Sequence, residues 1–269
     1  MGGAPLAATI ASGSPVATQP QLPFVRDIRA EYPKATPTAD SLGEAEASDQ
    51  QRYYLKGDLG GKPIRASEWI STQLAELIGI AAPAVAILRR SNGETVFGSR
   101  RLIGVADEIV TRNFLLTASA SNAQPVVVGL CPLLSAIYAF DLFVFNDDRH
   151  LGNYLSLDDN GVRRFYAFDF SRSLFWRWPW IDFPGPLDNT RTWGSVLRSR
   201  HGFDIGAAEA IVDRLRTVSR AMVESIMFGV PDDWLTEPQK QEFLDWWDSS
   251  ARMARLDALS IGLANGSLL

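Results

Sequence analysis

Near the middle of the chain the sequence reads NDDRHLGN (residues 146–153), a dense polar run that directly follows an apolar segment of helical length at residues 133–144. A cluster of ionisable side chains of this kind does not belong in a hydrophobic core. A solvated loop that ends a helix would account for most Asp-rich runs, because Asp and Asn favour turns. The run therefore indicates a function only in combination with residues later in the chain.

A β-hairpin is predicted to follow the polar run. Residues 154–157 and 162–168 have the residue types of two short strands, and Asp-Asp-Asn-Gly between them suits a tight turn. The second strand leads directly to Asp169, within the segment AFDFS. Because a hairpin returns the chain to its starting point, we expect Asp169 to lie beside Asn153.

Asp148, Asn153 and Asp169 together match the needs of phosphoryl transfer. One carboxylate must orient a hydroxyl and accept its proton, while an amide oxygen and a second carboxylate must hold Mg²⁺ against the phosphates. The five-residue step from Asp148 to Asn153 allows one loop to supply both a base and a metal ligand. Asp147 is the alternative base, but its step to Asn153 is one residue longer. Asp141, on the preceding helix, could accept hydrogen bonds from the loop.

This pattern resembles the catalytic loop of HipA-like kinases. The motif of that family, Asn-x-Asp-x-His-x-x-Asn, is present here as Asn146, Asp148, His150 and Asn153. Its core, Asp-Arg-His-x-x-Asn, is shared with phosphatidylinositol kinases, and both groups belong to the wider protein-kinase-like fold. The near-neutral pKa of a histidine would suit a base. The resemblance instead implies a scaffolding role for His150, which supports the loop and the metal-binding segment, and makes Asp148 the base.

Upstream of the loop, two more residues resemble parts of a kinase. Lys56 ends a predicted strand at residues 52–56 and resembles the lysine that contacts the ATP phosphates. Glu68 lies near the start of a helix predicted to run from Ser67, its N-cap, to residue 78, and it resembles the glutamate that orients this lysine. Taken singly, each residue has an ordinary structural explanation. A lysine in a strand is usually a solvated edge residue, and a glutamate near the start of a helix interacts favourably with the helix dipole.

The order of the candidate residues supports the resemblance more than any one of them. The kinase order is found here as Lys56, Glu68, Asp148, Asn153 and Asp169. The segment around Asp169 also resembles the metal-binding Asp-Phe-Gly segment, although Ser171 replaces the usual glycine. The resemblance covers residues 50–175 and implies ATP and Mg²⁺ as cofactors, with Asn153 and Asp169 as the metal ligands.

Two parts of the ATP site are weakly marked in the sequence. No Gly-x-Gly-x-x-Gly phosphate loop precedes Lys56, and Gly43 is the candidate for a sparse equivalent. The order of the fold places the junction of two lobes near residues 101–104, where Leu102 and Ile103 would contact the adenine.

The resemblance implies an α+β, two-lobed protein-kinase-like fold. We expect residues 1–25 to form a flexible leader, residues 26–104 a small strand-rich N-lobe with the ATP-contacting lysine, and residues 105–269 a mostly helical C-lobe with the catalytic loop and the metal-binding segment. Hydrophobic periodicity and turn residues add paired strands at residues 85–88 and 95–97, and amphipathic helices at residues 207–227 and 238–263.

Composition limits the classes of function. The net charge is −5 without a basic block, which argues against a nucleic-acid binder and against binding to an anionic membrane surface. The single cysteine, Cys131, allows no internal disulfide and, with only two histidines, argues against a structural zinc site. No apolar run has the length of a transmembrane helix. A cytoplasmic protein is therefore expected.

An aromatic cluster, FWRWPWIDF (residues 175–183), follows Asp169 at the place of a kinase activation segment. Packing of these side chains against the C-terminal helices is one interpretation. A substrate platform or a loop that dips into a membrane is the other.

The leading hypothesis is a HipA-like Ser/Thr protein kinase that binds ATP and Mg²⁺ between two lobes. It would act on a protein substrate, and an antitoxin-like protein is a further expected partner. The first alternative is a lipid or small-molecule kinase of the phosphatidylinositol-kinase type, which the Asp-Arg-His core and the tryptophans favour. The second is a pseudokinase that serves as a binding module, which only the missing glycine loop favours.

Overall fold

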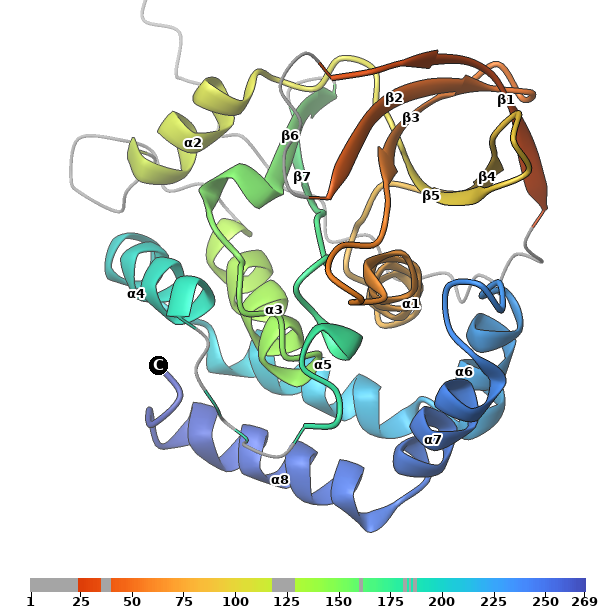
Figure 1. Cartoon of the computed structure of the whole chain (residues 1–269). Helices are drawn as coiled ribbons and strands as arrows, with labels where there is room; N and C mark the ends of the chain where they lie inside the picture. Colours follow the sequence, from red (N-terminus) through yellow and green to blue (C-terminus); the bar gives the residue numbers. More distant parts are fainter. Residues whose placement is uncertain are drawn as a thin grey trace, which may run out of the picture.

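The computed structural model describes residues 24–34, 40–117, 129–159, 162–180, 183, 185 and 188–269. These residues form a mixed α+β fold. A small closed sheet occupies the upper right of Figure 1, helix α1 (Ile64–Leu77) lies below it, and most of the other helices fill the lower half. The leader expected at residues 1–25 lies outside the described residues except for its last two positions, and Val25 already begins a strand.

The closed sheet is a small barrel of strands in the order β1-β2-β3-β5-β4. The strands are β1 (Val25–Tyr32), β2 (Ser41–Ala47), β3 (Arg52–Lys56), β4 (Val85–Arg89) and β5 (Thr95–Arg100). Neighbours pair antiparallel except β1 and β4, whose parallel pairing closes the barrel. Alternate side chains of β2 and β3 point inward and fill the interior, Ala45, Ala47 and Leu55 among them.

Three of these strands agree with the sequence analysis. The strands predicted at residues 52–56, 85–88 and 95–97 are confirmed as β3, β4 and β5. In the turn between β4 and β5, Gly93 takes a φ of +88°, and Asn92 Oδ1 accepts a hydrogen bond from Glu94 N (3.0 Å). Local turn chemistry therefore explains this strand pair.

Helix α1 follows β3 in the chain and starts earlier than predicted. It begins at Ile64, directly after Pro63, rather than at Ser67. The prediction of Ser67 as the N-cap is wrong, because its amide already donates to Pro63 O (3.1 Å) and its hydroxyl is buried. Proline suits this helix start, since it lacks an N–H that would have no partner there. The earlier start places Glu68 in the second turn of α1, where it is buried.

The apolar segment before the polar run forms α3 (Leu130–Phe143), which is buried along most of its length. A 3₁₀ turn, η1 (Leu151–Asn153), then leads into the hairpin of β6 (Tyr154–Asp159) and β7 (Val162–Ala167). The predicted hairpin is confirmed, and its register pairs the first residue of β6 with the last residue of β7. The residues one step further out, Asn153 and Phe168, therefore lie next to each other.

The remaining helices are α2 (Glu108–Thr117), α4 (Asp188–His201), α5 (Ile205–Thr217), α6 (Arg220–Phe228), α7 (Glu237–Trp247) and α8 (Ser250–Ala264). The helices predicted for residues 207–227 and 238–263 are each divided in two. Ser219 and Ser249 begin new helices, because their hydroxyls accept hydrogen bonds from backbone N–H groups of the following turn.

The described part of the aromatic cluster packs against α7. The ring centroids of Trp178 and Phe243 are 5.3 Å apart, and those of Trp180 and Trp246 are 4.7 Å apart. Packing is therefore the correct interpretation for these side chains, and the membrane-dipping loop is wrong for them. Residues 181 and 182 of the cluster lie outside the described residues. Among the helices of the described residues, none combines the length and apolar character needed to span a bilayer.

Candidate active site

The loop at residues 146–153 is held by Asp141, a fully buried residue of α3. Asp141 accepts hydrogen bonds from Asn146 Nδ2 (2.8 Å) and from Arg149 through Nε (2.8 Å) and Nη2 (2.9 Å). A buried carboxylate is stable only when donors of this kind compensate it. The hydrogen bonds expected from the loop to Asp141 are present, so the loop is built over a buried ion pair.

Arg149 also joins the loop to the segment before Asp169. Its Nη1 donates hydrogen bonds to Asn153 O (2.9 Å) and to Phe168 O. The amide of Phe168 in turn donates to Asn153 O (3.3 Å). The guanidinium lies 4.7 Å from the centre of the buried Phe170 ring. The hairpin thus brings Asn153 and Asp169 together, as the sequence predicts.

Asn153 is buried, and a contact within the loop orients its side chain. Its Nδ2 donates a hydrogen bond to Asp148 O (2.8 Å). The amide oxygen points away from this bond, and no described residue donates a hydrogen bond to it. An oxygen in this state is available to a hard cation such as Mg²⁺.

Asp169 follows the hairpin in the left-handed backbone region, with a φ of +60°. Few residues other than glycine adopt this region, and Asp is one that tolerates it. Its Oδ1 accepts hydrogen bonds from Ser171 Oγ (2.8 Å) and from Lys56 Nζ (3.0 Å). Ser171, which replaces the usual glycine, therefore helps to fix the carboxylate.

Carboxylates from distant parts of the chain surround the ammonium of Lys56. Its Nζ lies 2.6 Å from an oxygen of Asp40, 3.0 Å from one of Asp169 and 3.6 Å from one of Glu68. The lysine side chain is 14 % exposed, so it is not a solvated edge residue. Glu68 also accepts a hydrogen bond from Phe170 N (3.0 Å), which links α1 to the residue after Asp169.

The charges of this cluster decide its protonation. Burial lowers the pKa of Lys56, but the carboxylates of Asp169, Glu68 and Asp40 outweigh this effect and hold the pKa above its usual value. Burial raises the pKa of Asp169, and the opposing effects of Lys56 and Ser171 more than reverse this, lowering the pKa to about 2. Burial raises the pKa of Glu68 to about 8 despite the charge of Lys56. Lys56 and Asp169 are therefore charged at neutral pH.

The two candidate bases, Asp147 and Asp148, differ in their partners. Asp147 Oδ2 lies 2.6 Å from the guanidinium of Arg177, and the carboxylate is 9 % exposed. Asp148 is half-buried, and its Oδ1 accepts a hydrogen bond from Asn189 Nδ2 in the first turn of α4 (2.6 Å). Asp147 is engaged in an ion pair, whereas Asp148 keeps one oxygen available.

A family model described as HipA-like kinase matches residues 44–174, a segment that contains Lys56, Glu68, the 146–153 loop and Asp169. The matched segment resembles HipA-like kinases. It covers just under half of the chain and holds the candidate residues on which the sequence analysis depends. A comparison with curated proteins gives no match.

Two solved structures are similar to this chain. The proinflammatory kinase CtkA of Helicobacter pylori gives a TM-score of 0.55 at 14 % sequence identity, and the match covers 91 % of this chain and 99 % of that chain. HipA of Shewanella oneidensis MR-1, solved with HipB and operator DNA in a toxin–antitoxin system, gives a TM-score of 0.48 at 13 % identity, with coverages of 81 % and 62 %. At its low identity, the likeness to CtkA shows the fold alone.

The ring of His150 turns back onto its own loop. Its Nδ1 accepts a hydrogen bond from Gly152 N (3.0 Å) at the start of η1. A Cβ atom on Gly152 would lie 2.9 Å from the ring, so glycine permits this close approach. The contact agrees with a scaffolding role for His150, which stays a prediction.

The residues expected to contact other parts of ATP lie in different surroundings. Leu102 is half-buried, whereas the side chain of Ile103 is 90 % exposed. Gly43 lies in β2 with a φ of +109°, and a Cβ atom there would come within 2.5 Å of Tyr32 O. Gly43 is thus needed for the close pairing of β1 and β2. Its role toward phosphates, and the adenine contacts of Leu102 and Ile103, stay predictions.

The donor set of the candidate site fits Mg²⁺. Asp169 supplies an ionised carboxylate and Asn153 an amide oxygen, and Mg²⁺ prefers oxygen ligands of this kind. Carboxylate oxygens of Asp40, Glu68 and Asp169 also lie within 4.8 Å of one another. Asp40 and Asp169 bring two carboxylates to the single positive charge of Lys56, so a divalent cation would be favoured beside them.

Several residues of the site carry no signal in the sequence. Asp40 precedes β2, Arg177 lies inside the aromatic cluster, and Asn189 lies 41 residues after its partner Asp148. Each is an ordinary polar residue in a loop or at a helix end. No motif marked them, because only the tertiary structure brings them to the site.

Proposed function

We propose that this protein is a HipA-like kinase that transfers the γ-phosphate of ATP to a Ser or Thr hydroxyl of a protein. The observation that supports this most is the contact of Lys56 with Asp169, 113 residues later in the chain, beside the loop that carries Asp148. Phosphoryl transfer depends mainly on positioning and on neutralisation of charge. The cluster around Lys56 supplies both.

In the proposed mechanism, the ammonium of Lys56 binds phosphate oxygens of ATP. Glu68, which Phe170 N holds by a hydrogen bond, keeps the lysine in place. Asn153 and Asp169 would hold Mg²⁺, which when bound neutralises charge on the phosphates.

The acceptor side of the mechanism depends on Asp148. Its free carboxylate oxygen accepts a hydrogen bond from the acceptor hydroxyl, orients the hydroxyl oxygen toward the γ-phosphorus and takes the proton. Asn153 and His150 keep the backbone of the loop in the shape that this requires.

We further propose that residues 26–104 and 105–269 act as the two lobes of a kinase, with ATP between them. The barrel and α1 would form one side of the site and the 146–153 loop the other. Val105 pairs with Leu157 of β6, which joins the two parts close to the proposed junction. Leu102 and Ile103 would lie on the adenine side of this junction.

A protein acceptor is favoured over a lipid. The tryptophans that would have supported a membrane-dipping loop pack against α7 instead. A pseudokinase is not favoured, because Lys56 and Asp169 are in contact beside the loop that carries Asp148 and Asn153. A cytoplasmic location rests on composition, and an antitoxin-like partner rests on the family resemblance alone.

Incubation of the purified protein with radiolabelled ATP, with and without Mg²⁺, tests the proposal. We expect transfer of label to protein hydroxyls only with Mg²⁺, and mass spectrometry would locate the modified residues. Label on phosphoinositide vesicles with none on protein would favour the lipid kinase. Binding of ATP with no transfer to any acceptor would favour the pseudokinase.

A further inference from the structure

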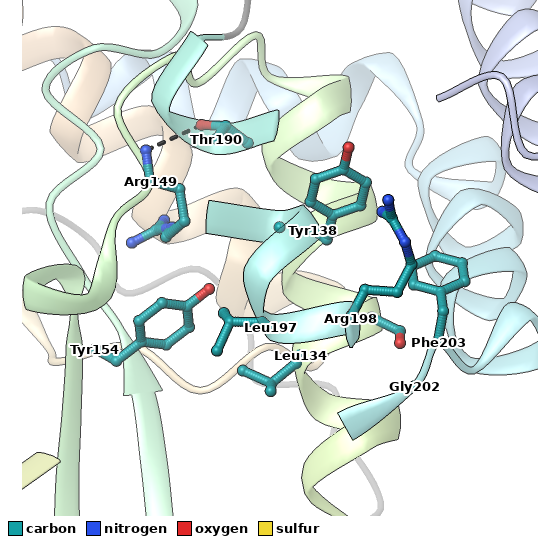
Figure 2. A pocket seen from close by; sticks show the side chains of 11 residues that line it. Leu134, Tyr138, Arg149, Tyr154, Thr190, Leu197, Arg198, Gly202 and Phe203 are labelled. Carbon is teal, nitrogen blue, oxygen red and sulfur yellow. Dashed lines mark hydrogen bonds between the residues drawn. The ribbon is translucent and has the colours of Figure 1, made fainter. Parts of the chain in front are cut away.

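The first turn of α4 is bonded to the 146–153 loop through two neighbouring residues. The hydroxyl of the buried Thr190 donates to Asn146 O (2.6 Å) and accepts a hydrogen bond from Arg149 N (2.9 Å), the second of which is drawn in Figure 2. Asn189 Nδ2 donates to Asp148 Oδ1 (2.6 Å). Three of the first four loop residues are therefore held by one helix.

Packing against α3 fixes the position of α4. A Cβ atom on Gly194 of α4 would lie 2.5 Å from the ring of Tyr138, so glycine allows the two helices to approach closely. Figure 2 shows Leu197 of α4 and Leu134 of α3 beside a small cavity beneath the loop, with Tyr154 across from them. The helix is thus held independently of the loop and can serve as its support.

Asn189 orients the side-chain carboxylate of Asp148, which the contacts within the loop leave free to rotate. The backbone of Asp148 is held by Asn146 Oδ1 at its N–H (3.3 Å) and by Asn153 Nδ2 at its carbonyl (2.8 Å). The carboxylate could still rotate about two torsions, and among the described residues only Asn189 donates a hydrogen bond to it. This bond occupies Oδ1 and leaves Oδ2 for the acceptor hydroxyl.

The neutral amide of Asn189 also suits a base better than a cation would. The guanidinium of Arg177, beside Asp147, favours the charged carboxylate, although burial outweighs this effect and raises the pKa of Asp147. A carboxamide is neutral, so it orients the carboxylate while stabilising its charged form less than a guanidinium does. The two neighbouring aspartates thus have partners that suit different tasks.

We propose that Asn189 is a positioning residue that aims the carboxylate of Asp148 at the acceptor hydroxyl, with α4 as its support. This inference rests on the proposed kinase function. A displacement of about 1 Å in a reacting group can cost about 100-fold in rate. Loss of Asn189 should therefore lower kcat by about 10- to 100-fold. The KM for ATP should not change, because Asn189 has no contact with the cluster around Lys56.

Two substitutions separate this role from a structural one. Asn189→Asp keeps the shape of the side chain, and Asp is favourable near a helix N-terminus, so thermal stability should be preserved. The new carboxylate cannot donate a hydrogen bond and repels Asp148. We expect kcat, measured by transfer from radiolabelled ATP, to fall in Asn189→Ala and to fall further in Asn189→Asp. Thr192→Ala, at an exposed position of the same helix, is the control and should keep full kcat.

A double-mutant cycle with Asp148→Asn completes the test. If Asn189 acts through Asp148, Asn189→Ala should cost no further rate in the Asp148→Asn background. Wild-type kcat in both Asn189 variants, or losses that multiply in the double variant, would overturn the inference and leave the kinase function intact. Full activity of the Asp148→Asn variant alone would show that Asp148 is not the base. It would then overturn both the proposed mechanism and this inference.

Discussion

The carboxylate of Asp40 contacts the ammonium of Lys56 at the place where a phosphate of ATP is proposed to bind. Asp40 Oδ2 lies 2.6 Å from Lys56 Nζ, closer than the oxygen of Glu68 at 3.6 Å, and the side chain of Asp40 is only 17 % exposed. A phosphate oxygen that binds this ammonium must displace Asp40. We therefore predict that Asp40→Asn binds ATP more tightly than the wild type does.

The size of the gain follows from the strength of the contact between Lys56 and Asp40. A hydrogen bond between charged groups contributes about 1.5–3 kcal/mol, and both side chains here are largely shielded from water. The displaced carboxylate regains water, which offsets part of this energy, so we take the lower figure of about 1.5 kcal/mol. The Kd for ATP should then fall about tenfold in Asp40→Asn.

Isothermal titration calorimetry with ATP, with and without Mg²⁺, measures this change. The control is Asp232→Asn, which breaks another contact between lysine and aspartate, from Lys240 Nζ to Asp232 Oδ1 at 2.7 Å. It should leave the Kd for ATP unchanged. An unchanged Kd in Asp40→Asn would refute the competition between Asp40 and ATP. A weaker affinity that appears only with Mg²⁺ would instead make Asp40 a metal ligand.

Three further predictions test the site. Asp169→Asn should abolish turnover and weaken Mg²⁺-dependent ATP binding measured by calorimetry, because an ionised metal ligand is lost; normal activity would contradict the metal assignment. Asp148→Asn should lower the kinase rate by roughly two to four orders of magnitude with ATP affinity nearly unchanged, and a dead Asp147→Asn beside an active Asp148→Asn would reverse the choice of base. Burial raises the pKa of Glu68 from 4.5 to about 8, so its contribution to the free energy of unfolding is present at low pH and is lost as the pH rises through about 8. Denaturant titrations should show this loss in the wild type but not in Glu68→Gln, and the same pH dependence in both would assign the titration to another group.

Elements with signals inside a few neighbouring residues were predictable from the sequence. The hairpin of β6 and β7 follows from strand residues on both sides of a turn sequence, and β3 from its aromatic residues and the glycine after it. The helix breaks at Ser219 and Ser249 were not predictable in this way. A serine cap contributes about 1 kcal/mol and leaves the apolar periodicity intact on both sides.

Only those residues of the candidate site that belong to a sequence motif were predictable. Lys56 and Glu68 follow one another in a recognisable order, so the resemblance already implied that Glu68 lies beside Lys56. The contact of Lys56 with Asp169 was not predicted. Asp40 and Asn189 depend instead on how the barrel closes and on how α4 lies against α3. Contacts that arise from packing between distant segments leave no local pattern in a single sequence.

The buried pair of Asp141 and Arg149 ties the 146–153 loop to the buried helix α3. Local opening of the loop would leave one of these charges without its partner in the interior, at a cost of about 3–5 kcal/mol. Amide hydrogens of the loop should therefore exchange with solvent nearly as slowly as those of α3. At this cost the loop is open for less than about 1 % of the time, so this half of the site keeps one shape on average. Movements that admit or release a nucleotide would then come mainly from the barrel, in which Asp40 directly precedes β2.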